Sequence, residues 1–165
     1  MERFYHTFKK VSDGLNSLIK IVVFVLLFAL VITVTIQIIF RVFFTPFSWT
    51  EELSRYLLVW DSLLAATVAY KQNSHIAITF VIDKLAIRAK KMFRILSYSV
   101  SILFFIVAIY YGIKMISLQI YQTSPALLIP MKIVYLCLPL SFSVMLYHGL
   151  VNLIGELIKF KEVEK

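Results

Sequence analysis

The chain has 165 residues, of which 61% are hydrophobic and 16% are charged. A soluble domain of this length could not bury so much apolar surface, so lipid must be the solvent for much of the chain. The formal net charge of +8 comes from basic residues that flank apolar runs, a distribution that fits anionic lipid headgroups rather than nucleic acid. Cys137 is the only cysteine, which excludes an internal disulfide and any paired-cysteine redox or zinc motif.

Four long apolar segments predict an all-α integral membrane protein that forms a single domain over residues 1–165. A hydrocarbon core about 30 Å thick is crossed by about 20 helical residues. Pro139 lies inside the fourth segment and should bend it, which a membrane helix tolerates where neighbours satisfy the freed carbonyl. The expected transmembrane helices cover residues 21–40, 53–70, 95–113 and 133–155.

The basic residues in the flanks predict the orientation of these helices. Thirteen lie in the N-terminal tail, in the connection between the second and third spans, and in the C-terminal tail, against three in the other two connections. By the positive-inside rule, both termini and the middle connection are expected in the cytoplasm of a bacterium, with the chain in its inner membrane. The middle connection ends in residues 83–96, which are apolar on one helix face and basic on the rest. This pattern predicts a basic amphipathic interfacial helix between spans two and three, or the basic start of span three.

Residues 48–61 begin as a helix start and carry ionisable groups into the second span. Ser48 and Glu51 have the spacing of a capping box. Glu51 and Arg55 are four residues apart and can pair along one helix face. Glu51, Glu52 and Arg55 therefore form either a solvated cap at the periplasmic boundary or part of a protein–protein interface.

Asp61 lies deeper, two to three turns into the second span. An unpaired carboxylate at that depth costs roughly 2.5–3.5 kcal/mol on insertion scales. We therefore expect Asp61 to face another helix or a partner subunit. An ion or proton site is the alternative, but the sequence offers no relay partner for it.

No catalytic constellation is visible, so we expect neither an enzyme nor a bound cofactor. The chain has four glycines and no glycine-rich phosphate loop, and no group of carboxylates and histidines has metal-ligand spacing. Imidazoles on facing helices can clamp a haem iron, and His75 and His148 are expected toward the same side of the membrane. His75, however, lies beyond the end of the second span. A haem- or quinone-binding anchor and a self-contained small exporter or channel remain as alternatives.

Two motifs stand out in the chain. The first comprises Arg55-Tyr56, Trp60, Ala65-Ala66 and His75-Ile76, and the second comprises Ser124 to Pro130, Val134-Tyr135 and Pro139. Together they resemble the small membrane subunit of tripartite ATP-independent periplasmic (TRAP) transporters, the DctQ-like family. The second motif lies before the last helix, and the resemblance covers nearly the whole chain. Ala65, Ala77 and Thr79 depart from residues common in that family.

The resemblance implies a non-catalytic subunit that supports a large membrane subunit and helps to dock a soluble periplasmic binding protein. The large subunit would carry an organic acid coupled to sodium, either a C4-dicarboxylate or sialic acid, of which sialic acid is our choice. The proline-bracketed segment 124–130 is then either a tight helix connection or a contact surface for a partner. The candidates for the subunit interface are Glu51, Glu52, Arg55, Tyr56, Trp60, Asp61 and His75. The candidates for periplasmic docking are Ser124, Pro125, Ala126, Leu127 and Pro130.

Overall fold

The computed structural model describes residues 2–43, 45, 47–72 and 87–163, and these are helical except for short connections. Within them the prediction of an all-α protein is confirmed, since the only β-type pairing is an isolated bridge between Thr123 and Pro130. The helices are α1 (Glu2–Phe43), α2 (Ser48–Lys71), α4 (Ile87–Leu118), α5 (Met131–Tyr135) and α6 (Cys137–Val163).

Three stretches of the described chain are long and apolar enough to cross a membrane: Thr7–Phe43, Met92–Leu118 and Met131–Ile158. Helix α2 is not among them, although its 24 residues would span about 36 Å at 1.5 Å per residue, because Arg55 and Asp61 interrupt its apolar run. A fourth span therefore stays a prediction. Of the predicted amphipathic segment 83–96, the part from Ile87 onward is the beginning of α4, and the part before it lies outside the described residues.

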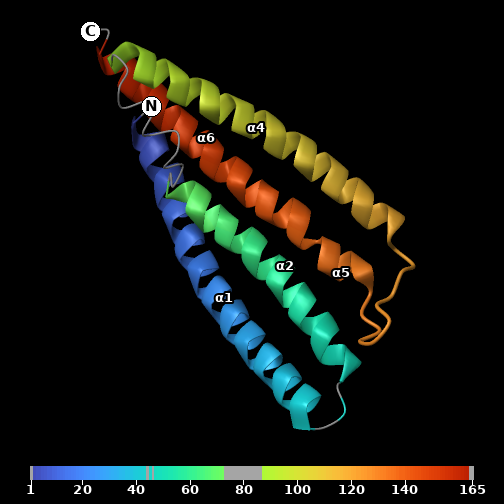
Figure 1. The fold of residues 1–165 in the computed structure, drawn as a ribbon. Helices are drawn as coiled ribbons and strands as arrows, with labels where there is room; N and C mark the ends of the chain where they lie inside the picture. The colour runs from blue at the N-terminus through green and yellow to red at the C-terminus, as the bar shows by residue number, and fades with distance from the viewer. Residues whose placement is uncertain (1, 44, 46, 73–86, 164–165) are drawn as a thin grey trace.

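The long helices lie in a row in the order α4, α6, α2, α1 (Figure 1), with each helix packed on the next. Both termini, the end of α2 and the start of α4 lie at one end of the row, here called the termini end. The connections from α1 to α2 and from α4 to α5 lie at the opposite end, the loop end. At the termini end α1 also reaches α6, where the backbone carbonyl of Phe8 accepts a hydrogen bond from the Tyr147 hydroxyl at 3.1 Å.

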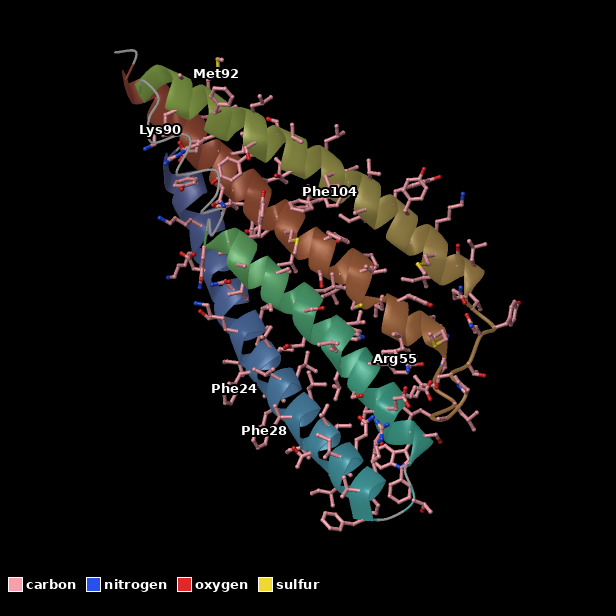
Figure 2. All side chains as sticks on the ribbon, in the orientation of Figure 1. Phe24, Phe28, Arg55, Lys90, Met92 and Phe104 are labelled. Atoms are coloured by element: carbon pink, nitrogen blue, oxygen red, sulfur yellow. The ribbon has the colours of Figure 1, made fainter. Side chains whose placement is uncertain are left out.

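The two outer helices, α1 and α4, each bury one side and expose apolar residues on the other. Phe24 and Phe28 point outward from the α1 edge (Figure 2) and are 69% and 61% exposed. On α4, Phe105 is buried while Leu103 and Ile106 beside it are exposed. The first and third predicted spans are apolar on every side. In the structure one side of each helix packs against the protein and the other side is exposed.

The main buried cluster lies where α2, α6 and α4 meet. Tyr70, Phe105 and Met145 form its centre, and the Tyr70 and Phe105 rings pack edge to face with centroids 5.0 Å apart, a preferred geometry for aromatic pairs. This cluster joins helices that are far apart in sequence and fixes their order in the row.

Pro139 interrupts the last membrane helix as predicted. Because proline has no N–H, the carbonyl of Tyr135 loses its partner four residues on, and the chain breaks at Leu136 into α5 and α6. Gly112 of α4 packs against this break, where an added Cβ would lie 3.3 Å from Pro139 Cδ. The missing side chain lets α4 approach the bend closely.

Replacing Gly112 with leucine is expected to lower the free energy of unfolding by about 1–3 kcal/mol, the usual effect of overpacking a close contact. Gly14→Leu is the matched control, because a Cβ at Gly14 meets no atom within 4 Å. Thermal unfolding of the two variants in detergent measures the difference. Equal melting temperatures would show that α4 does not depend on this contact.

Candidate partner-binding site at the start of helix α2

A carboxylate just after the first turn of α2 binds the loop before α5. Glu52 is buried, and its Oε2 accepts hydrogen bonds from the backbone N–H groups of Ala126 at 2.8 Å and Leu127 at 3.0 Å. Its Oε1 accepts from the Tyr56 hydroxyl at 2.5 Å. We call this group of four residues, together with Ser124, the Glu52 clamp. The clamp ties together two segments that lie 74 residues apart.

The hydrogen bonds of the clamp determine the charge state of Glu52. Burial by itself would raise the pKa of the Glu52 carboxyl, but the hydrogen bonds from Tyr56, Ser124, Ala126 and Leu127 hold that pKa below its ordinary value of 4.5. Because the folded-state pKa is the lower one, the stability that the ionised carboxylate contributes is present above pH 4.5. It is lost as the pH falls through the lowered pKa.

The loop that the clamp binds is also ordered from within. Buried Ser124 donates its backbone N–H to the carbonyl of Ile129 at 2.9 Å and accepts the Ile129 N–H on its Oγ at 3.2 Å. Leu128 between them has φ 53, a left-handed conformation that non-glycine residues rarely adopt. Its side chain is 73% exposed, so the loop presents an apolar residue from a fixed backbone.

The predicted ion pair at this helix start is confirmed, and the predicted capping box is wrong. Arg55 Nη2 lies 3.0 Å from Glu51 Oε1, with both side chains about two-thirds exposed, so the pair contributes little to stability. The helix begins at Ser48 with Phe47 at the N-cap position and has no side-chain cap. Thr50 donates its hydroxyl to the Phe47 carbonyl at 2.7 Å instead.

The remaining candidates spread away from the clamp. Trp60 and Asp61 are half-buried further along α2, and His75 lies outside the described residues. In the loop, Pro125 is exposed, while Pro130 is half-buried at the N-cap position of α5. Glu52 thus joins the candidates for the subunit interface at the start of α2 to the candidates for periplasmic docking in the loop. Asp61 has no part in this contact.

A second polar group, at the termini end, was not foreseen in the sequence. Lys71 Nζ donates to Ser12 Oγ and lies 2.8 Å from Asp13 Oδ1. Ser12 Oγ in turn lies 2.7 Å from His148 Nδ1, and both Ser12 and His148 are fully buried. This Lys71 cluster joins α1, α2 and α6. The signal available in the sequence was a histidine inside the last apolar run, combined with a topology that places Lys71 and Ser12 at the same end.

No group of three or more histidine, cysteine, aspartate or glutamate side chains suited to a metal ion occurs in the part of the chain that the structure describes.

Comparisons with known proteins match the chain to a transport family. A family model described as the DctQ component of tripartite ATP-independent periplasmic transporters matches residues 30–158. The isethionate TRAP transporter permease protein DctMQ of Oleidesulfovibrio alaskensis is 36% identical over 113 residues, which is 66% of this chain and 17% of that protein. A protein named as a TRAP transporter small permease protein in Haemophilus influenzae is 44% identical over 36 residues, 22% of each chain. The matches therefore span less than a quarter of either relative.

Proposed function

We propose, since the chain belongs to the family of DctQ components of tripartite ATP-independent periplasmic transporters, that it is a non-catalytic small permease subunit. In this proposal it scaffolds a large membrane subunit and helps to dock a periplasmic substrate-binding protein. The observation that carries the proposal is the open row of helices with an uncovered apolar face on each outer helix.

The row of helices supports a scaffolding role because it leaves broad surfaces without a protein neighbour. The exposed side of α1 around Phe24 and Phe28 and the exposed side of α4 around Leu103 and Ile106 suit lipid or another apolar helix surface equally well. The relative from Oleidesulfovibrio carries its matching stretch inside a single, much longer permease chain. That arrangement supports a large membrane polypeptide as the neighbour.

The Glu52 clamp supports a docking role for the loop before α5. Docking is more favourable when the contact surface is already ordered, because less conformational entropy is lost on binding. Among the exposed residues of this loop are two large apolar ones, Leu128, at 73%, and Tyr121, at 97%. Ser124 and Glu52 are buried, so their proposed part is to hold the loop rather than to touch the partner.

The proposed topology has α2 as a second span, so that the chain crosses the inner membrane four times with both termini in the cytoplasm. The supporting observations are the distribution of basic residues, thirteen against three, and the common end of the row on which both termini lie. The loop end, with the Glu52 clamp, would then face the periplasm.

The proposed cargo is an organic acid, carried by the large subunit in symport with sodium and without a cofactor in this chain. C4-dicarboxylates and sialic acid remain the proposed classes, and the relative named for isethionate extends the range of organic anions to be tested.

Deleting this chain from cells that retain the large subunit and the binding protein is expected to abolish uptake of the cargo. Radiolabelled uptake measures this, with a plasmid copy of the chain as the restoring control. Full uptake without the chain would overturn the proposal. Transport by the purified chain alone in liposomes would favour a self-contained exporter or channel, and a Soret band in the purified protein would favour a haem anchor.

A further inference from the structure

Asp61 is an ionisable residue in the interior of α2 that the described residues of its own chain do not satisfy. It is half-buried, and its Oδ1 is buried without a hydrogen-bond partner. No hydrogen bond or ion pair involves Asp61 anywhere in the part of the chain that the structure describes. It lies 13 residues after the first residue of α2, about 20 Å along the helix axis.

The neighbours of Asp61 on α2 cannot provide a donor. Residues three and four positions away on a helix are its neighbours on the helix surface. At Asp61 these are Leu57, Leu58, Leu64 and Ala65, whose side chains are all apolar.

Helix α1, which packs beside α2, cannot provide a donor either. The two helices run antiparallel, because Lys71 meets Ser12 and Asp13 at one end and Phe47 meets Phe40 at the other, with ring centroids 4.6 Å apart. By these two contacts Asp61 lies opposite about residue 24 of α1, and residues 21–27 around that position contain no polar side chain.

The side of α2 next to Asp61 is open. Leu58 is 54% exposed, and the exposed Ser62 already donates its hydroxyl to the carbonyl of Val59 at 3.1 Å. Lipid tails have no donors, and a carboxylate at bilayer depth is costly unless another group pairs with it. Because no described residue of this chain pairs with buried Asp61 Oδ1, we infer that its complement comes from outside these residues.

We propose that the large membrane subunit places a lysine or arginine side chain against Asp61 within the membrane. This inference rests on the proposed function, because it takes the large subunit as the neighbour on the open face of α2. A cation is the complement that a buried carboxylate requires, since it supplies both charge and hydrogen-bond donors. The pair would fix the register of α2 against the large subunit.

The test is co-purification of the large subunit with a tagged form of this chain, using Asp61→Asn, Asp61→Leu and the neighbouring control Ser62→Ala. Both Asp61 variants are expected to recover at least about tenfold less large subunit, since removing one partner of a buried charge pair strongly weakens an interface. The isolated Asp61→Leu subunit is expected to unfold at the same temperature as the wild type or higher, because an uncompensated charge has been removed. If Asp61 only stabilised its own chain, the recovery of the large subunit and the unfolding temperature of the isolated subunit would fall together.

A charge exchange identifies the partner residue. Asp61→Lys is combined in turn with Asp at each intramembrane lysine or arginine of the large subunit, and one combination is expected to restore recovery. Unchanged recovery with Asp61→Asn would overturn the inference while leaving the proposed function in place. Sodium-dependent thermal stability of the isolated wild-type chain that is lost in Asp61→Asn would also overturn it, in favour of an ion site. If the wild-type chain recovers no large subunit, the proposed function fails and this inference fails with it.

Discussion

Replacing Glu52 with glutamine is expected to release the loop before α5 while leaving the helices intact. Glutamine keeps the size of the side chain but loses the charge, and its NH₂ group cannot accept hydrogen bonds. The N–H groups of Ala126 and Leu127 now share one carboxylate oxygen, and the Tyr56 hydroxyl uses the other. Glutamine has one acceptor oxygen, so Ala126, Leu127 and Tyr56 can no longer all donate to this side chain, and the hydrogen bonds that remain are no longer charge-assisted.

Amide hydrogen exchange at Ala126 and Leu127 measures this release. We expect exchange to accelerate by about tenfold or more in Glu52→Gln, because local opening no longer breaks charge-assisted hydrogen bonds. Glu51→Gln is the matched control in the same helical turn, since its carboxylate pairs with exposed Arg55 and does not touch the loop. Exchange rates that are the same in the two variants would show that the clamp does not order the loop.

The pH dependence of exchange gives an independent check of the same carboxylate. In the wild type, exchange corrected for its intrinsic pH dependence should rise as the pH falls through the lowered pKa of Glu52. Glu52→Gln has no carboxyl at this position and should lack that rise. If the loop is the docking surface, uptake by cells carrying Glu52→Gln should fall although the subunit still assembles.

The sequence indicated both halves of the clamp but not their contact. The charged start of α2 and the proline-bracketed loop were each recognisable, because charge beside an apolar run and two closely spaced prolines are local patterns. That Glu52 binds the amides of Ala126 and Leu127 depends on α2 packing beside α5 and α6. Local patterns left Glu52 as either a solvated cap or an interface residue, and tertiary packing made it a buried support for the loop.

The order of the helices in the row could not be predicted from the sequence. The apolar surfaces of the two outer helices could. Spans one and three are apolar all round, which favours surfaces for lipid or a partner over a water-filled path, and the structure leaves apolar faces of both helices exposed. Apolar residues on every side of a helix do not say which side meets its own chain, because lipid and protein are equally acceptable neighbours. Only the break at Pro139 followed directly from covalent geometry, since any proline inside a helix removes one donor.

The Lys71 cluster is expected to contribute to the stability of the fold rather than to partner binding. Lysine can only donate, so Ser12 Oγ accepts from Lys71 Nζ and lies within hydrogen-bond distance of His148 Nδ1, at 2.7 Å. Ser12 of α1 thus bridges Lys71 of α2 and His148 of α6. One lysine therefore determines the hydrogen bonds that join three helices at the termini end.

Lys71→Met keeps the length of the side chain but removes every donor, which leaves Asp13 without its ion pair and Ser12 free to turn away from His148. We expect the free energy of unfolding to fall by about 2 kcal/mol, the range for losing hydrogen bonds to a charged group, because the Lys71 side chain is only 12% exposed. Thermal unfolding in detergent measures the loss, with exposed Lys10→Met as the control for charge. Ser12→Ala should cause part of the same loss, since it cuts the link to His148 but retains the contact between Lys71 and Asp13. Should Lys71→Met unfold at the same temperature as Lys10→Met, the Lys71 cluster would not be what holds the three helices together.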